Sequence, residues 1–358
     1  MDWNVILPLA SSVLSLVFAL MLLDQWRTRH RPYQLAWAIG MLWYGLSAGT
    51  EWYGGAYGWS EPLYRAWYLI GAVWVAAWLG MGTVYLLSRT RFGYCLAFSF
   101  ALAGLFTYLS WRRYAYADSG IAIVLYPLIG LALAAIIALF TYRGDHRWAS
   151  LTGGALVVGT IASAVLVLTV PLAAPGYFVD PTTGIPAGEL FPGYIRLLTP
   201  FFNITGGFAL VLGAVYSAYV FMPKRRVIHY DLNADDGLGT FLRNLVISPF
   251  AIVVNLIASI PGALSALFGG RLDGRVPATA LIALGGLIPS ITSGANRFGE
   301  TGLFYVGEFL GVVFLFAGFA VSALGIGDIR IPFTGIVLLR RMPRPETARP
   351  SRSGEDPA

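Results

Sequence analysis

The stretch that decides the fold is VILPLASSVLSLVFALMLL, residues 5–23, which is followed by three arginines, Arg27, Arg29 and Arg31. About 20 predominantly apolar residues are enough to cross the hydrocarbon core of a bilayer as an α-helix. A cleaved signal peptide would carry its positive charges before the apolar run and a small-residue cleavage site after it. Here Asp2 precedes the run and the arginines follow it. The sequence therefore predicts a retained first helix with its N-terminus outside.

Six further apolar runs follow within residues 1–226, and the basic residues in the short linkers between them alternate from one linker to the next. Loops rich in Arg and Lys stay in the cytoplasm, so this alternation predicts seven helices with the N-terminus outside. The runs cover residues 34–52, 63–87, 94–109, 121–142, 151–172 and 195–222. The inside loops carry Arg27, Arg29, Arg31, Arg89, Arg91, Arg143, Arg147, Lys224, Arg225 and Arg226. Outside, or at outer helix ends, are Arg65, Arg112, Arg113 and Arg196.

The chain divides into four segments by composition. They are a seven-helix transmembrane block (1–226), a cytoplasmic polar linker (227–244), a second hydrophobic module (245–325) and a basic, partly disordered cytoplasmic tail (326–358). The usage is heavy in Ala, Gly and Arg, and Lys224 is the single lysine, which indicates a GC-rich bacterial genome. We therefore expect a protein of the bacterial inner (cytoplasmic) membrane.

The number of crossings depends on the first apolar run of the second module, residues 245–268. This run carries Pro249, Asn255 and Pro261, which would interrupt a straight helix. Irregular backbone at membrane depth is tolerated only where protein or a water cavity shields it. If the run does not cross, the basic tail lies inside, which the positive charges favour. We expect an all-α, polytopic transmembrane helix bundle with about nine crossings (alternative ten), one interfacial or re-entrant segment and a cytoplasmic C-terminus.

The composition fits a membrane protein and argues against a nucleic-acid partner. Hydrophobic residues make up 57% of the chain and charged residues 12%, and the mean hydropathy is +0.68. Soluble domains carry about 25% charged residues. The net charge of +6 resides in loops beside apolar spans, where basic residues face anionic lipid. The expected partner is the lipid bilayer, and no nucleic acid.

The third apolar run contains a seam of large and small residues at helical spacing. Tyr64, Trp67, Gly71, Trp74, Trp78, Met81 and Tyr85 alternate in steps of three and four, and Glu51 lies close by in the chain. One hypothesis is an outward-opening aromatic pocket for an apolar or cationic ligand, built on Glu51, Trp67, Trp74 and Trp78. The alternative is an interfacial aromatic belt with helix packing. Because Gly71, Gly80 and Gly82 let a neighbouring helix approach, we expect the seam to face protein.

Two further candidates come from polar groups inside apolar runs. Glu308 lies about six residues into the last run, or ~9 Å deep at 1.5 Å per residue, where an ionisable group is costly unless it faces protein or water. We expect it to point into the bundle, towards a polar partner or a water-filled cavity. It could carry a proton or coordinate an ion, or instead pair with Arg297. Asn203 and Thr205 lie beside Pro200 and the pair Gly206–Gly207, which predicts a loosened helix of the kind that forms substrate sites in transporters. Close packing of helices explains the same residues.

The sequence contains no convincing enzyme motif, so we expect no catalytic residue, no metal and no cofactor. The string Gly45-Leu46-Ser47-Ala48-Gly49 matches the nucleophile-elbow pattern, but it lies within an apolar helix rather than at a strand-to-helix turn. All three histidines fall in predicted loops, and no His, Cys or carboxylate spacing matches a metal site.

Residues 1–226 resemble the seven-helix membrane sensor region at the N-terminus of some bacterial histidine kinases. The features shared are the topology with the N-terminus outside, the stretch 37–51, and the third helix RAWYLIGAVWVAAWLGMGTVYLL, residues 65–87. The resemblance implies a sensor or small-ligand-binding protein. Because another membrane module follows the seventh helix instead of an output domain, that role would require a separate membrane or cytoplasmic signalling partner. The alternative is a transporter or channel for a small solute or ion, built on Asn203, Thr205, Glu308 and the interrupted segment near residues 249–261.

Overall fold

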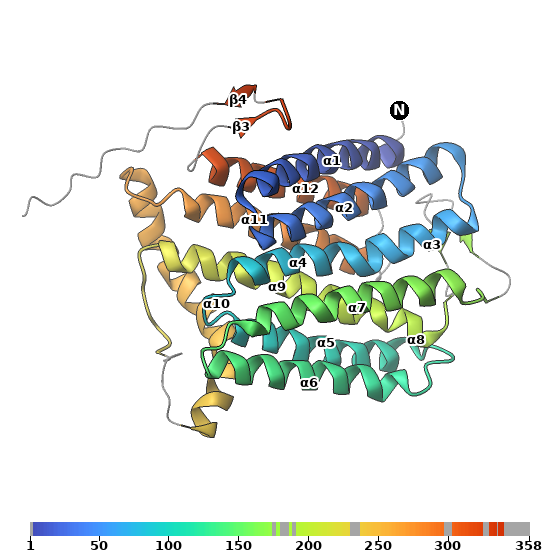
Figure 1. Ribbon diagram of the computed structural model, residues 1–358, viewed down its shortest axis with the longest axis horizontal. Coiled ribbons are helices and arrows are strands. Elements are labelled where there is room, and N and C mark those ends of the chain that lie inside the picture. The colour runs from blue at the N-terminus through green and yellow to red at the C-terminus, as the bar shows by residue number, and fades with distance from the viewer. Residues whose placement is uncertain are drawn as a thin grey trace, which may run out of the picture.

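The computed structural model describes residues 3–173, 177–179, 186–187, 191–229, 237–296, 303–324, 329–334 and 336–339. Within these residues the chain is helical apart from two short antiparallel strand pairs, which confirms the predicted all-α fold (Figure 1). The aspartates of the linker, Arg297 and the tail from residue 340 lie outside the described residues. The elements are α1 (Trp3–Arg29), α2 (Pro32–Tyr57), α3 (Glu61–Leu69), the π-helical turn η1 (Ile70–Trp74), α4 (Val75–Leu86), α5 (Gly93–Tyr114), α6 (Ala122–Tyr142), α7 (Arg147–Thr169), β1 (Phe178–Val179), β2 (Pro186–Ala187), α8 (Gly193–Arg196), α9 (Leu198–Phe221), α10 (Leu238–Phe268), α11 (Arg275–Asn296), α12 (Phe304–Leu324), β3 (Ile329–Arg330) and β4 (Val337–Leu339).

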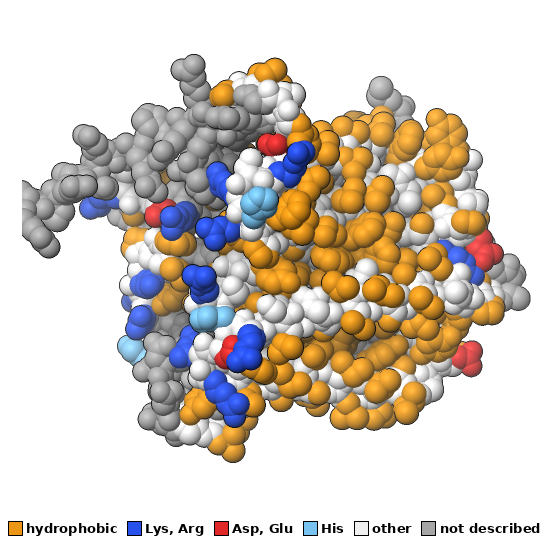
Figure 2. Space-filling view, viewed as in Figure 1, with side chains coloured by type: hydrophobic (Ala, Val, Ile, Leu, Met, Phe, Trp, Pro, Cys, Tyr) orange, Lys and Arg blue, Asp and Glu red, His pale blue; other side chains and the backbone are white. Residues whose placement is uncertain are grey.

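The described part of the chain contains nine helices that are long and apolar enough to cross a membrane, by length and composition. This set includes most of α10 and omits the less apolar α2, although α2 runs beside α1 and α4 in the bundle (Figure 1). The face of the bundle seen in Figure 2 is broadly apolar between its two ends. On α7, for example, Val158 is 68% and Ile161 is 61% exposed. A water-soluble protein rarely exposes so large an apolar surface, so the bundle fits the predicted polytopic membrane protein.

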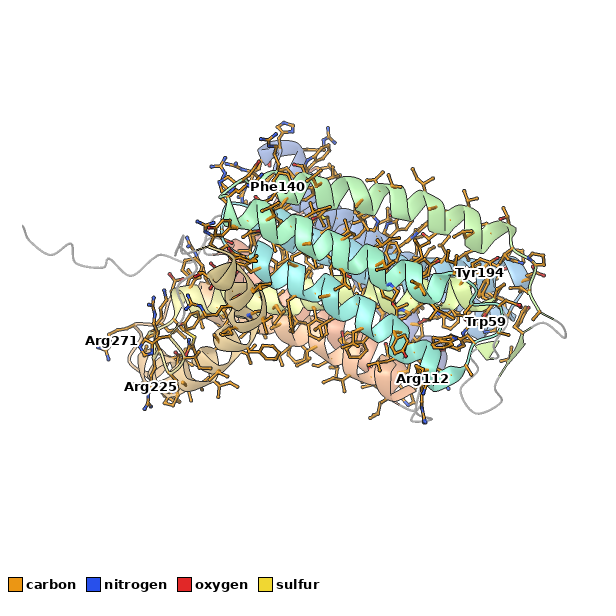
Figure 3. All side chains as sticks on the ribbon, turned by 90° about the horizontal axis from the view of Figure 1, so that it is seen from below. Trp59, Arg112, Phe140, Tyr194, Arg225 and Arg271 are labelled. Atoms are coloured by element: carbon orange, nitrogen blue, oxygen red, sulfur yellow. The ribbon has the colours of Figure 1, made fainter. Side chains whose placement is uncertain are left out.

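Lys and Arg side chains gather at one end of the bundle, which we call the basic end (Figure 2). It is the end at which α1 stops and α5 and α7 begin. Helix α10 lies across this end and contacts α5, α6 and α9 (Figure 1). Arg225, before α10, and Arg271, after it, lie at the same end of the molecule (Figure 3). The course of α10 therefore fits an interfacial segment better than a tenth crossing.

The predicted interruption of this segment is wrong, because α10 is one unbroken helix from Leu238 to Phe268 with both prolines inside it. Its polar side chains hold the segment that follows α9. Asn255 Oδ1 accepts hydrogen bonds from the backbone N–H groups of Val227 and Ile228, at 2.8 and 2.9 Å, and Ser259 Oγ accepts one from Arg225 N at 2.8 Å. The polar face of α10 is thus turned inward. Its outward face is apolar, as expected for a helix that meets lipid, and consists of Leu242, Val246, Phe250, Ile257 and Leu264.

Glycines bring α4 and α9 into backbone contact. A Cβ atom at Gly80 would collide with the carbonyl oxygen of Gly206, and a Cβ at Gly206 would collide with that of Ala76. Helix α9 is continuous from Leu198 to Phe221, with Pro200 in its first turn. The predicted loosening of this helix is therefore wrong, and Gly206 serves close packing instead.

The second module packs against the first block as a helical hairpin. Helices α11 and α12 contact each other closely, since a Cβ at Gly311 would meet the ring of Pro289. Helix α12 lies along α1, where Phe18 contacts Phe316 and Phe319 with ring centroids 5.5 and 4.8 Å apart. Helix α11 lies along α9. This arrangement places the start of α12 beside the end of α2, away from the basic end (Figure 1).

Candidate functional site

Two glutamates from distant parts of the chain meet between α2 and α12. Glu51 lies six residues before the end of α2, and Glu308 lies four residues after the start of α12. The carboxyl groups of the two residues are within hydrogen-bonding contact of each other. Glu51 is 1% exposed, and the Oε2 atom of Glu308 is buried. We call these two residues the carboxyl pair.

Neutral groups complete the surroundings of the carboxyl pair. The indole Nε1 of Trp67 donates a hydrogen bond to Glu51 Oε1 at 2.7 Å. The hydroxyl of Tyr44 donates to the backbone oxygen of Glu308 at 2.8 Å, and this links α2 to α12 a second time. The Oε2 atoms of Glu51 and Glu308 receive no donor from the described protein. A proton or cation between the two carboxyl groups would satisfy these oxygens.

Among the residues that the structure describes, no Lys or Arg side chain forms a salt bridge with the carboxyl pair. The salt bridges formed among the described residues are Arg65–Glu61, with 2.7 Å between Nη2 and Oε1, and Arg147–Asp145, with 2.9 Å between Nε and Oδ2. An ionised carboxylate only accepts hydrogen bonds, so two carboxyl groups share one only when at least one of them is protonated. Two like charges at such close range repel strongly where water is excluded. A proton shared between the two carboxyl groups would relieve this repulsion.

Three of the seven residues predicted from the sequence, Glu51, Trp67 and Glu308, come together at this site. We predicted that Glu308 would point into the bundle towards a polar partner, and its contact with Glu51 confirms this. Tyr44 was missed. Its position two helical turns before Glu51 on α2 places both side chains on one face of the helix, which is the signal that could have identified it.

Trp74 and Trp78 lie on the same seam but bond to a different helix. Trp74 Nε1 donates to Ser163 Oγ at 3.0 Å, and Trp78 Nε1 donates to Thr160 Oγ1 at 3.2 Å, both on α7. Trp74 is 9% exposed, so the prediction that the seam faces protein is confirmed there. The π turn η1 lies between Trp67 and Trp74 and rotates the helix relative to a regular α-helix. Consequently the N–H of Trp67 reaches α2, whereas those of Trp74 and Trp78 reach α7.

Asn203 and Thr205 lie elsewhere, on α9. Thr205 lines an apolar cavity of about 80 Å³ among α4, α5, α6, α7 and α9, and neither carboxyl of the pair borders it. The hydroxyl of Thr205 donates to the backbone oxygen of Phe201 at 2.9 Å, so it offers this cavity no free donor. Asn203 is partly exposed two residues earlier on the same helix. The structure thus separates these two candidates from Glu308, which the transporter hypothesis had grouped with them.

Among the described residues there is no group of three or more His, Cys, Asp or Glu side chains that could hold a metal ion. Comparisons with protein-family models, with curated proteins and with solved structures found no match to this chain. The arguments that follow therefore rest on the geometry of the carboxyl pair.

Proposed function

We propose that this protein is a membrane sensor that binds a proton or a small cation at the carboxyl pair and acts through a separate partner at the basic end. The observation that carries the proposal is the contact between Glu51 and Glu308, because it joins the seven-helix block to the second module. A change in occupancy of the pair changes the force between α2 and α12. An empty, doubly ionised pair pushes the two helices apart, and a loaded pair holds them together.

Helix α12 supplies a route from this site to the basic end. It starts beside the carboxyl pair and ends near the inner end of α1. The segment that follows it folds back onto α1, since Phe333 N donates to Asp24 Oδ1 at 3.3 Å and the guanidinium of Arg27 lies 5.4 Å from the Phe333 ring. A displacement of α12 would reach this contact. A signalling partner at the basic end would detect it there.

The proposal includes an orientation, with the basic end in the cytoplasm and the carboxyl pair near the outer face of a bacterial inner membrane. The concentration of Lys and Arg at one end supports it (Figure 2). A reporter fused after Arg352 should then be active only in the cytoplasm. Activity of this fusion in the periplasm would refute the orientation.

Infrared difference spectroscopy on the reconstituted protein tests binding directly. We expect a carboxylic-acid C=O band that changes when pH is varied at constant salt, or when Na⁺ or K⁺ is varied at constant pH, and the two titrations distinguish a proton from a cation. Glu51→Gln and Glu308→Gln should each remove this band. Asp118→Asn is the matched control, because Asp118 is an exposed carboxyl outside the pair. A band unaffected by both substitutions would refute the proposal.

The second candidate function is transport of the same ion, since the pair lies inside the bundle rather than in a surface loop. Flux into proteoliposomes under a pH or cation gradient separates the two functions. A sensor shows no flux above that of empty liposomes. A transporter shows flux that Glu308→Gln abolishes while expression is maintained.

A further inference from the structure

The cavity that Thr205 borders lies inside the seven-helix block, and almost all of its surface is apolar. Its two hydroxyl groups are already bonded within their own helices, since Thr152 donates to Trp148 O at 2.8 Å and Thr205 donates to Phe201 O at 2.9 Å. A buried water molecule needs about two to four polar partners, whereas a cavity lined by hydrocarbon stays dry and accepts apolar molecules. The cavity therefore suits a hydrocarbon and not water or an ion.

The volume of the cavity limits how much hydrocarbon can enter. The cavity measures about 80 Å³. An apolar cavity of about 150 Å³ accepts a benzene molecule. The smaller volume has room for a few carbon atoms, but not for a whole lipid or for a fused ring system. The molecule that fits is therefore either very small or the narrow end of a longer one.

The position of the cavity along the helices places it near the middle of the membrane. Of its lining residues, Ala155 lies eight residues after the start of α7, and Leu133 lies nine residues before the end of α6. At 1.5 Å per residue, both lie about 12 to 14 Å from the basic end. This is close to half of the ~30 Å thickness of the hydrocarbon core. The hydrocarbon chains of bilayer lipids end at this depth, so their methyl ends are what the membrane presents to the cavity.

The cavity is not sealed, and α7 forms its wall towards the lipid. The seam between α7 and α4 is closed, because the indoles of Trp74 and Trp78 donate to hydroxyls of α7 at 3.0 and 3.2 Å and the hydroxyl of Tyr85 packs against Gly153. Helices α6 and α7 contact each other only lightly, and Leu133 of α6 is partly exposed. The passage from the bilayer to the cavity therefore runs between α6 and α7.

We propose that this cavity is a binding site for the methyl end of one hydrocarbon chain of a membrane lipid, which enters sideways between α6 and α7. Gly80 and Gly206, through which α4 and α9 touch, also border the cavity, so the lipid fills the space beside this contact. An empty void would deprive its lining of dispersion contacts, and a bound lipid chain restores them. The site is separate from the carboxyl pair, and the inference does not rest on the proposed function.

Photo-crosslinking in vesicles tests the site in the full-length protein. The probe is a phosphatidylcholine that carries a diazirine at the methyl end of one acyl chain, diluted into unlabelled phosphatidylcholine, and mass spectrometry locates the adducts. We expect adducts at Met81, which borders the cavity, as well as at Val158 on the outward face of α7. Met81 is 3% exposed, so lipid that only coats the bundle cannot label it. A probe with the diazirine beside the ester carbonyl should leave Met81 unlabelled.

Filling the cavity supplies the control. Ala155→Phe should lower the adduct yield at Met81 about 10-fold, because its ring takes up the free space, and leave the yield at Val158 unchanged. Ala155→Leu should act in the same direction if the phenylalanine variant does not fold. Ala162→Phe, the same substitution on the exposed face of α7, should change neither yield.

Two results would overturn the proposal. One is a native protein without adducts at Met81, or with a yield there that neither substitution of Ala155 changes. The other is labelling of Met81 by a small detached apolar diazirine but not by the lipid probe, because the cavity would then hold a free molecule and not a lipid chain.

Discussion

Removing the donor from Trp67 tests how tightly the carboxyl pair is held. Trp67→Phe keeps an aromatic ring and deletes the 2.7 Å hydrogen bond from Nε1 to Glu51 Oε1. Hydrogen bonds to charged groups contribute about 1.5–3 kcal/mol. Interhelical hydrogen bonds in membranes average ~0.6 kcal/mol and reach ~1.7 kcal/mol in double-mutant cycles. Because the acceptor is a buried carboxyl that has no other protein donor at its second oxygen, we expect a loss of about 1–2 kcal/mol in the free energy of unfolding.

Reversible unfolding in mixed micelles measures this loss, and Trp78→Phe is the matched control. Trp78 donates over 3.2 Å to the neutral hydroxyl of Thr160, which also bonds to Leu156 O at 2.8 Å. In the control, the free energy of unfolding should therefore fall by only about 0.5 kcal/mol. In the Glu51→Gln background the Trp67→Phe effect should shrink, because the charged acceptor is gone. Equal losses for the two tryptophans, or an effect independent of Glu51, would refute the reasoning.

Three further outcomes are expected. Gly206→Val should abolish folding, because the valine side chain would overlap the α4 backbone. Gly207→Val should be tolerated, since a Cβ there meets only a hydroxyl oxygen at 3.7 Å. Similar yields of the two variants in size-exclusion chromatography would contradict this prediction. Asn255→Ala removes three hydrogen bonds to the segment 225–228, so trypsin should cleave that segment faster, and an unchanged rate would argue against its tethering. Phe18→Ala removes the ring contacts with Phe316 and Phe319, so it should weaken the docking of α12 on α1 and lower the free energy of unfolding, and an unchanged free energy would argue against this contact.

The helical fold could be predicted because its signals are local. Apolar runs and basic loops each report on their own stretch of chain, and the behaviour of α10 followed from the balance of charges at its two ends. The unbroken course of α10 was not predicted, because Pro249 and Pro261 argue locally against it, whereas the helices that α10 contacts, α5, α6 and α9, lie elsewhere in the chain. The continuity of α9 was not predicted either, because the contact that Gly206 makes with α4 cannot be seen in the local sequence.

The candidate site was predicted in part. Depth in the membrane singled out Glu308, since the cost of a carboxyl there is a local argument. The contacts of Glu308 are not local, since its backbone oxygen bonds to Tyr44, at a sequence separation of 264 residues. The π turn η1 also has no evident local signal in the sequence. Because of this turn, Trp67 bonds to α2 and Trp74 bonds to α7, whereas a regular helix would present both side chains on one face.

The position of α10 across the basic end has a consequence for biogenesis. Because the chain leaves α9 and enters α11 at the same end, the hairpin α11–α12 can insert as one unit from the basic end, after the helices that precede it (Figure 3). Until it docks, Glu308 faces lipid, which costs about 2.5–3.5 kcal/mol for an acidic residue at the centre of a helix and less near its end. Docking on α1 and α2 relieves that cost. The contact between Glu51 and Glu308 can therefore form only after the hairpin has docked.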